Sequence, residues 1–323
     1  MKRLPLLLSL AVLVALLFVA SLAAGKVFVP FSAWFTDDPR WWIVAELRLP
    51  RAILGLVIGA GLGLTGAVLQ GYLRNPLADP SVLGVSSSAA LGAVAAIVLF
   101  AASAPLAIFG AAMLAAGGSM LLLAALAWRS QSAVTFVLAG TVLASLGGAL
   151  TAFLISIAPN PYATAEIIDW IMGSLTDRSF AEVQLAVPFI LVGGFLLLFT
   201  GRALDALTLG EEAARSLGLR LERTQALVVI GAGLVVGASV AVTGVVGFVG
   251  LIVPHLLRPV VGAKPSALLL PSALGGAALV LAADSLVRLA PGAAEIRLGV
   301  AMALIGTPFF FGLLLKLRRS AWI

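Results

Sequence analysis

The chain has 323 residues, of which 62% are hydrophobic and 11% charged, and its mean hydropathy is +1.16. This composition excludes a soluble domain and predicts a polytopic membrane protein. The absence of cysteine and the single histidine, His255, exclude thiol chemistry and a multi-histidine metal site, and the net charge of +6 is not gathered with aromatics into a nucleic-acid surface.

The first 25 residues resemble a secretory signal peptide, because Lys2 and Arg3 precede an apolar run and Ser21–Ala23 offers a cleavage site. We expect this segment to remain as the first span. Its apolar run is long for a signal peptide, and keeping it makes the parity of the later spans consistent. Residues 26–46 then lie outside, with tryptophans at 34, 41 and 42 as interfacial anchors.

Apolar runs of helical length recur along the whole chain and lack the alternation of barrel strands. They predict ten spans, at about 4–25, 47–72, 82–103, 105–128, 134–158, 181–200, 224–242, 245–261, 266–289 and 296–315. The predicted fold is therefore an all-α membrane protein of ten transmembrane helices, with a single transmembrane domain over 1–323.

The basic residues set the orientation of these spans. With the N-terminus inside, 13 of the 20 lysines and arginines fall in inner segments and 7 in outer ones. Because cytoplasmic segments are enriched in basic residues, both termini of this multi-pass protein are predicted to be cytoplasmic.

Small residues recur at helical spacing in two of the predicted spans. Gly55, Gly59 and Gly63 in the second span, and Gly233 and Gly237 in the seventh, allow close approach of another helix, and we interpret them as packing devices. The segment 74–81, RNPLADPS, is predicted to be a tight inner turn because of its two prolines.

The fifth span carries a small, mildly polar face, and a short helix is expected soon after it in the outer loop, at TAEIIDWIMGSL. This face either lines a wet path or packs against a neighbour, and the pattern leaves both open. Its members are Thr141, Ser145, Gly148 and Ala152.

Residues 201–225 form the one long polar segment of the chain and hold eight charged residues. Thr208 and Glu211 predict a capping box, Glu211 and Arg215 a helical ion pair, and Gly218 a left-handed stop. Ala213, Ala214 and Leu217 give the short helix an apolar stripe. It is either an ordinary ordered loop or a docking element for a soluble partner.

Catalytic and nucleotide-binding motifs are missing from the sequence. There is no GxxxxGK[ST] loop and no HExxH motif, and His255 is interpreted as structural. Asp284 lies near the end of the ninth span, four residues before Arg288, which predicts an ion pair. An ion-coupled secondary transporter and a membrane-embedded enzyme remain as alternatives to a transporter subunit.

Three stretches together carry a family resemblance: 48–92, beginning RLPRAILGLVIGAG; 207–219, LTLGEEAARSLGL; and 244–258, GVVGFVGLIVPHLLR. They resemble the permease subunits of binding-protein-dependent ABC importers for iron-siderophores, haem and vitamin B12. The resemblance covers nearly the whole chain and implies a type II ABC importer permease that carries such a metal chelate inward. It does not choose among the three cargoes.

The resemblance also implies a location in the bacterial inner (cytoplasmic) membrane and a set of partners. Two permease chains would form a dimer with the path between them, two ABC ATPase subunits would bind ATP and Mg on the cytoplasmic side, and a periplasmic protein would deliver the substrate. This chain itself would bind no cofactor and catalyse no reaction, and apart from these proteins it would contact membrane lipid.

Several residues acquire expected roles from the same resemblance. The coupling helices match 201–223, with Glu211, Glu212, Ala213, Arg215, Leu217 and Gly218 as ATPase contacts. The docking residues for the binding protein match Arg48, Arg51 and Arg288, and the cytoplasmic gate matches Ser132, Ala133 and Val134. Arg297 stands where many relatives have a proline, so the start of the tenth span departs from the pattern.

Overall fold

The computed structural model describes residues 3–128, 133–262, 264–291 and 295–320, and over these residues the chain is helical and contains no strand. The long helices are α1 (Arg3–Ala23), α2 (Leu49–Tyr72), α3 (Val85–Phe100), α4 (Pro105–Trp128), α5 (Ala133–Ser156), α7 (Phe180–Leu198), α10 (Leu221–Thr243), α11 (Val249–Val261), α12 (Pro265–Leu289) and α13 (Leu298–Ser320). The short helices are α6 (Pro161–Ile171), α8 (Gly201–Leu207) and α9 (Glu211–Ser216), with single turns η1 (Phe31–Ala33), η2 (Ile43–Arg48) and η3 (Pro80–Leu83).

Each predicted span overlaps one of the long helices, although α3 and α11 are shorter than the spans predicted there. Within the described residues, seven helices are long and apolar enough to cross a membrane, and the shorter apolar helices are Val85–Phe100, Val249–Val261 and Leu298–Leu313. The outer-loop helix expected after the fifth span is α6, which begins earlier than predicted because Pro161 follows the capping residue Asn160.

Helix α2 is the centre of the bundle and lies directly against α12. A Cβ atom at Gly59 would collide with the backbone of Gly276, and one at Gly63 with the carbonyl of Ser272. Gly233 similarly admits the side chain of Met120 on α4. These contacts confirm the interpretation of the glycine ridges as packing devices, because the missing side chains let the α12 backbone approach α2 and the Met120 side chain approach α10.

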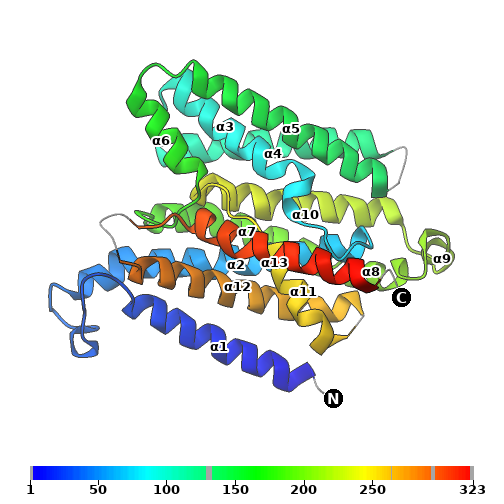
Figure 1. The fold of residues 1–323 in the computed structure, drawn as a ribbon, viewed down its shortest axis with the longest axis horizontal. Coiled ribbons are helices and arrows are strands. Elements are labelled where there is room, and N and C mark those ends of the chain that lie inside the picture. Colours follow the sequence, from blue (N-terminus) through cyan, green and yellow to red (C-terminus); the bar gives the residue numbers. More distant parts are fainter. Residues whose placement is uncertain (1–2, 129–132, 263, 292–294, 321–323) are drawn as a thin grey trace.

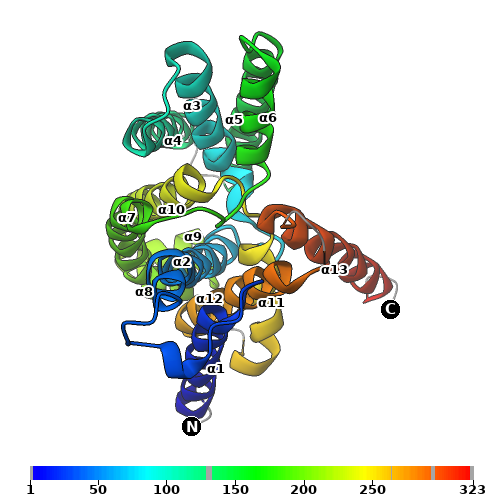
Figure 2. The same cartoon turned by 90° about the vertical axis from the view of Figure 1, so that its left-hand side faces the viewer.

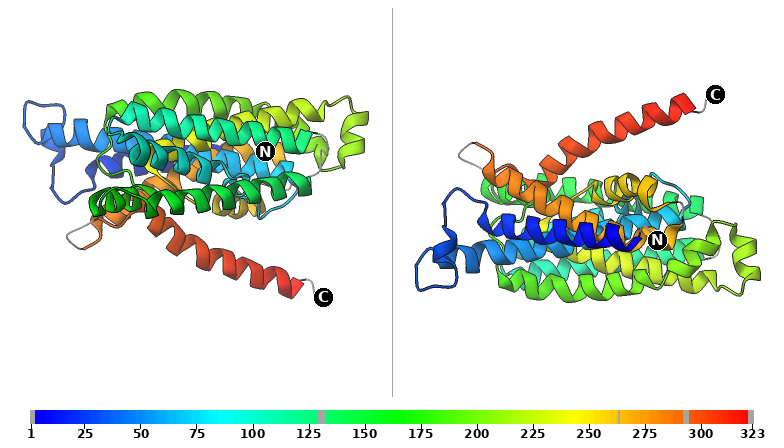
Figure 3. Two further views of the ribbon diagram at one scale, coloured as in Figure 1. Left: turned by 90° about the horizontal axis from the view of Figure 1, so that it is seen from above. Right: turned by 90° about the horizontal axis from the view of Figure 1, so that it is seen from below.

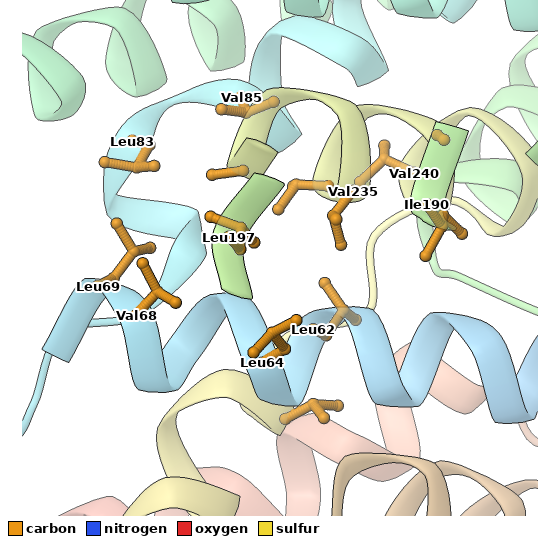
Figure 4. Packing of buried hydrophobic residues seen from close by; sticks show 14 of the residues in the cluster. Leu62, Leu64, Val68, Leu69, Leu83, Val85, Ile190, Leu197, Val235 and Val240 are labelled. Atoms are coloured by element: carbon orange, nitrogen blue, oxygen red, sulfur yellow. The ribbon is translucent and has the colours of Figure 1, made fainter. Parts of the chain in front are cut away.

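The main core lies on the other side of α2. Figure 4 shows Leu62, Leu64 and Val68 of this helix facing residues of α7 and α10, among them Ile190 and Val235. All five side chains are buried. Because most of the surface of α2 is covered by its own chain, this helix serves as the internal scaffold on which the outer helices are placed.

The eighth predicted span, 245–261, is only partly helical. Its first residues form an irregular segment, and α11 begins at Val249. Gly244 and Phe248 both have left-handed backbones, with φ of 70° and 67°, and a Cβ at Gly244 would collide with the carbonyl of Trp170. The segment is therefore fixed by tertiary contacts, including Phe248 against Gly306 of α13.

The two ends of the bundle carry different elements. Figure 1 shows α8, α9 and both chain ends at one end, and α6 with the segment between α1 and α2 at the other. We call these the α9 end and the α6 end. Helix α13 leans away from the bundle in both views of Figure 3, and Figure 2 places α7 on the side opposite to α13. Large parts of α5 and α13 are thus left uncovered by the chain.

Candidate functional site

Helix α9 projects from the α9 end, and its termini differ in part from the prediction. The predicted capping box is wrong: the N-cap is Gly210, and the Thr208 hydroxyl instead donates to the Asp205 carbonyl at 2.6 Å. The predicted stop is confirmed, because Gly218 has φ of 81°. The Gly218 N–H donates to the carbonyl of Arg215 at 2.8 Å, and the Leu219 N–H donates to the carbonyl of Ala214 at 3.2 Å, as in a Schellman motif.

Two acidic residues fix α8 and α9 to the bundle. Asp205 accepts hydrogen bonds from the backbone and hydroxyl of Ser266, at 2.9 and 2.7 Å, and lies 3.3 Å from Lys264. A carboxylate at this place caps the start of α12 and interacts favourably with the positive end of the helix dipole. The Glu211 carboxylate lies 3.6 Å from Arg74 in the turn after α2. The pair of short helices is therefore a supported element.

The apolar stripe of α9 is divided between two surfaces. Ala214 is fully buried against the chain and Ala213 is partly buried, whereas Leu217 is 65% exposed. Leu209, just before the helix, is 69% exposed, and Glu212 and Arg215 are also exposed. The α9 end therefore presents two uncovered leucines beside charged side chains. This combination suits a soluble partner better than a self-contained loop.

At the α6 end, the three arginines expected on the surface are buried, which corrects the expectation of exposed docking groups. Arg48 donates to the carbonyls of Leu22 and Ala23, at 3.0 and 2.8 Å. Arg51 and Arg288 both contact Asp284, at 2.9 and 3.0 Å. The predicted ion pair between Asp284 and Arg288 is confirmed, and Asp284 holds a second arginine as well. A buried guanidinium requires such partners.

Glu295 completes this network and was not singled out from the sequence. Its carboxylate contacts Arg51 at 2.9 Å and accepts the Thr176 hydroxyl at 3.0 Å. Burial raises the pKa of Glu295, but Arg51 and the hydrogen bonds lower it more, so the net pKa lies below its ordinary value. Only the closeness of Glu295 to Arg297 in AEIR hinted at a role, because its partners lie far away in sequence.

A cavity of about 230 Å³ opens beside this network. Its lining contains five basic residues, Lys26, Arg48, Arg51, Arg178 and Arg288, and two acidic ones, Asp177 and Glu295. Nearby, Arg297 pairs with Asp169 of α6 at 2.9 Å, which connects the start of α13 to α6. The α6 end thus carries a positive recess in place of three projecting arginines.

The small-residue face of α5 turns away from the chain. Thr141, Ser145, Gly148 and Ala152 are exposed, whereas Leu143 and Gly147 on the other face are buried, with Gly147 against Ser87. The face therefore does not pack a neighbour within this chain. Of the expected gate, Val134 is exposed near the start of α5, Ala133 is the first residue of that helix, and Ser132 lies outside the described residues.

Residues 13–316 match the FecCD transport family. The chain belongs to the FecCD transport family. It is 42% identical to the cobalamin import system permease BtuC of Halobacterium salinarum, over 84% of this chain and 73% of that protein. It is 36% identical to the hemin transport system permease HmuU of Yersinia pestis, over 96% of this chain and 95% of that protein.

The fold comparison agrees with the sequence relatives of this FecCD-family chain. A metal-chelate type ABC transporter solved in an inward-facing conformation superposes with a TM-score of 0.86 at 32% identity, covering 97% of this chain and 99% of that one. The expected family is thereby confirmed. The chain is a transmembrane permease subunit of an ABC importer and not the ATPase, and nothing in the comparisons supports the ion-coupled alternative.

Proposed function

We propose that two copies of this chain form the membrane path of an importer with ten spans per copy, and that the path carries a metal chelate inward. Permeases named for cobalamin, hemin and Fe(3+) dicitrate among the relatives support this class of cargo. A relative named for molybdate makes a smaller oxyanion the competing cargo. The uncovered faces of α5 and α13 support the second copy, which would close the path over Thr141, Ser145, Gly148 and Ala152.

The α9 end is proposed to be cytoplasmic. Both chain ends lie there, which agrees with an even number of crossings and with the excess of basic residues expected inside (Figure 1). Single cysteines in this cysteine-free chain test the orientation. Asp37→Cys should react with an impermeant thiol reagent in spheroplasts, and Thr208→Cys should react only after lysis. The reverse labelling would overturn the orientation.

In each of the two copies, helix α9 is proposed to dock one of two ATPase subunits. Its contacts would be Glu212, Ala213, Arg215 and Leu217, while Glu211 and Gly218 fix the ends of the helix. The observation that carries this proposal is Leu217, an apolar side chain left 65% exposed on a capped and braced element. At the inner mouth of the path, Ser132, Ala133 and Val134 are proposed as the gate.

The α6 end is proposed to receive the periplasmic binding protein. The partner would not contact exposed guanidinium groups, because Arg48, Arg51 and Arg288 are buried. These arginines would instead give the cavity at the α6 end a positive potential, which attracts acidic groups of the partner. Charge reversal of Arg178 at the recess should weaken docking, and added salt should weaken the unmodified complex in the same direction.

The decisive experiment places a charge on α9. Leu217→Asp would bury a carboxylate in the proposed contact at a cost of about 2 to 5 kcal/mol, so ATP-driven uptake into vesicles should collapse while the permease still inserts. Leu217→Met is the matched control and should keep most activity, because it preserves an apolar side chain. Full uptake by the aspartate variant would show that α9 belongs to an ordinary ordered loop and does not dock the ATPase.

A further inference from the structure

A second cavity, of about 540 Å³, lies where α7 ends and α10 begins, at the α9 end. One part of its lining is basic and the other apolar. Arg202 of α8 and Arg220 and Arg223 at the start of α10 form the basic part, and Leu196, Phe199 and Leu227 form the apolar part. A cavity divided in this way suits an amphiphile better than a purely polar anion.

The basic part contains no compensating acid. None of the lining residues is acidic, and among the described residues none of these three arginines is in a salt bridge. Glu222 lies between two of them in sequence but does not line the cavity. The first turn of the 23-residue helix α10 adds backbone N–H groups and the positive end of its dipole. The cavity is therefore prepared for negative charge.

The apolar part continues along the outside of α7. Leu191, Val192 and Phe195 of this helix and Phe199 just after its end are all exposed, and the two phenylalanine rings stack edge to face with their centres 4.7 Å apart. Figure 2 shows α7 on the opposite side of the bundle from α13, hence away from the proposed second copy. An exposed apolar face of a spanning helix in that position lies against lipid tails.

We propose that this cavity binds an anionic phospholipid of the membrane leaflet at the α9 end. Arg202, Arg220 and Arg223 hold the headgroup phosphate, since guanidinium groups bind phosphate oxygens in a forked geometry, and the acyl chains lie along α7. Free phosphate would leave the apolar half unused, and a soluble protein could not follow α7 into the membrane. With the α9 end cytoplasmic, as proposed above, this is the cytoplasmic leaflet. Only that assignment of the leaflet rests on the proposed function.

The site also adjoins the coupling element. Gly218 and Leu219, the two residues of the Schellman stop of α9, belong to the same lining. A lipid bound there braces the end of α9 from the membrane side, and its occupancy is therefore expected to raise the thermal stability of the permease.

The test uses the full-length permease in a neutral detergent, titrated with phosphatidylglycerol or phosphatidylcholine and followed by native mass spectrometry and thermal unfolding. Arg220→Gln/Arg223→Gln should weaken phosphatidylglycerol binding about 25-fold, at about five-fold per arginine, and should remove the stabilisation by this lipid. The matched control is Arg74→Gln/Lys264→Gln, which removes the same charge from the same end. Both control residues already face a carboxylate, so its binding should stay within about two-fold of the unmodified chain.

Four results would overturn the proposal. Equal loss in the control variant would indicate a diffuse charge effect, and equal binding of phosphatidylcholine would indicate acyl packing alone. Competition by millimolar inorganic phosphate would indicate that the site binds a free anion and not a lipid. If the double variant does not elute as a single species, Arg202→Gln alone should still lose about five-fold, and an unchanged affinity in that variant would equally contradict the site.

Discussion

The two ends of this permease use arginine in opposite ways. At the α6 end, Arg51 and Arg288 are buried and share Asp284, so their charge is used within the chain. At the α9 end, Arg202, Arg220 and Arg223 are exposed, line one cavity and are in no salt bridge among the described residues. The same residue type therefore fixes helices at one end and remains available for a ligand at the other. A count of charges along the chain indicates the side of the membrane, but only burial and partners indicate the role.

The sharpest way to break this comparison is to remove the shared acid of the α6 end. Asp284→Asn leaves buried Arg288 without a carboxylate partner and Arg51 with Glu295 alone, and it should cost about 3 to 5 kcal/mol of stability. Thermal unfolding of the purified permease would measure the loss. The double variant Asp284→Asn/Arg51→Gln should lose less than the two single changes together, because it removes a charge along with its partner. Strictly additive losses would show that the pair is not coupled.

Glu295→Gln tests the partly exposed edge of the same network and should cost less, about 1 to 2 kcal/mol, because solvent replaces part of the lost contact. The effect should depend on pH. The pKa of Glu295 is lowered in the folded state, so its contribution is complete above about pH 4.5, the ordinary value, and is lost as pH falls through the lower folded value.

A pH series of unfolding measurements checks this sign. The difference between the unmodified chain and the glutamine variant should shrink on acidification below that ordinary value. A difference in stability that grows on acidification would contradict the lowered pKa of Glu295. A difference that stays constant would show that the charge of the carboxylate does not contribute.

The smallest effect is expected at the surface pairs of the α9 end. Arg74→Gln should change stability by at most about 1 kcal/mol, because its contact with Glu211 is long, at 3.6 Å, and reaches solvent. Thermal unfolding at low and high salt would measure it, and salt should reduce the small difference further. A loss as large as that of Asp284→Asn would remove the distinction between the two ends.

The membrane class, the positions of most long helices, the close packing at the glycines and the family could be predicted from the residues alone. Each of these follows from local composition, helical spacing or long continuous motifs, so no distant contact is needed to predict it. The sequence also predicted the left-handed stop at Gly218 and the ion pair of Asp284 with Arg288, which involve residues at most five positions apart.

The burial and the partners of the charged side chains, in contrast, follow only from the assembled bundle. Arg51 meets Asp284 and Glu295 across more than 230 positions, and no local pattern shows that these side chains converge or that Arg48 is covered by the end of α1. The same holds for the segment before α11, whose left-handed residues are held by Trp170 and Gly306, and for the cavity between α7 and α10. Burial and pairing depend on which surfaces the helices present to one another, and that is fixed only when the bundle assembles.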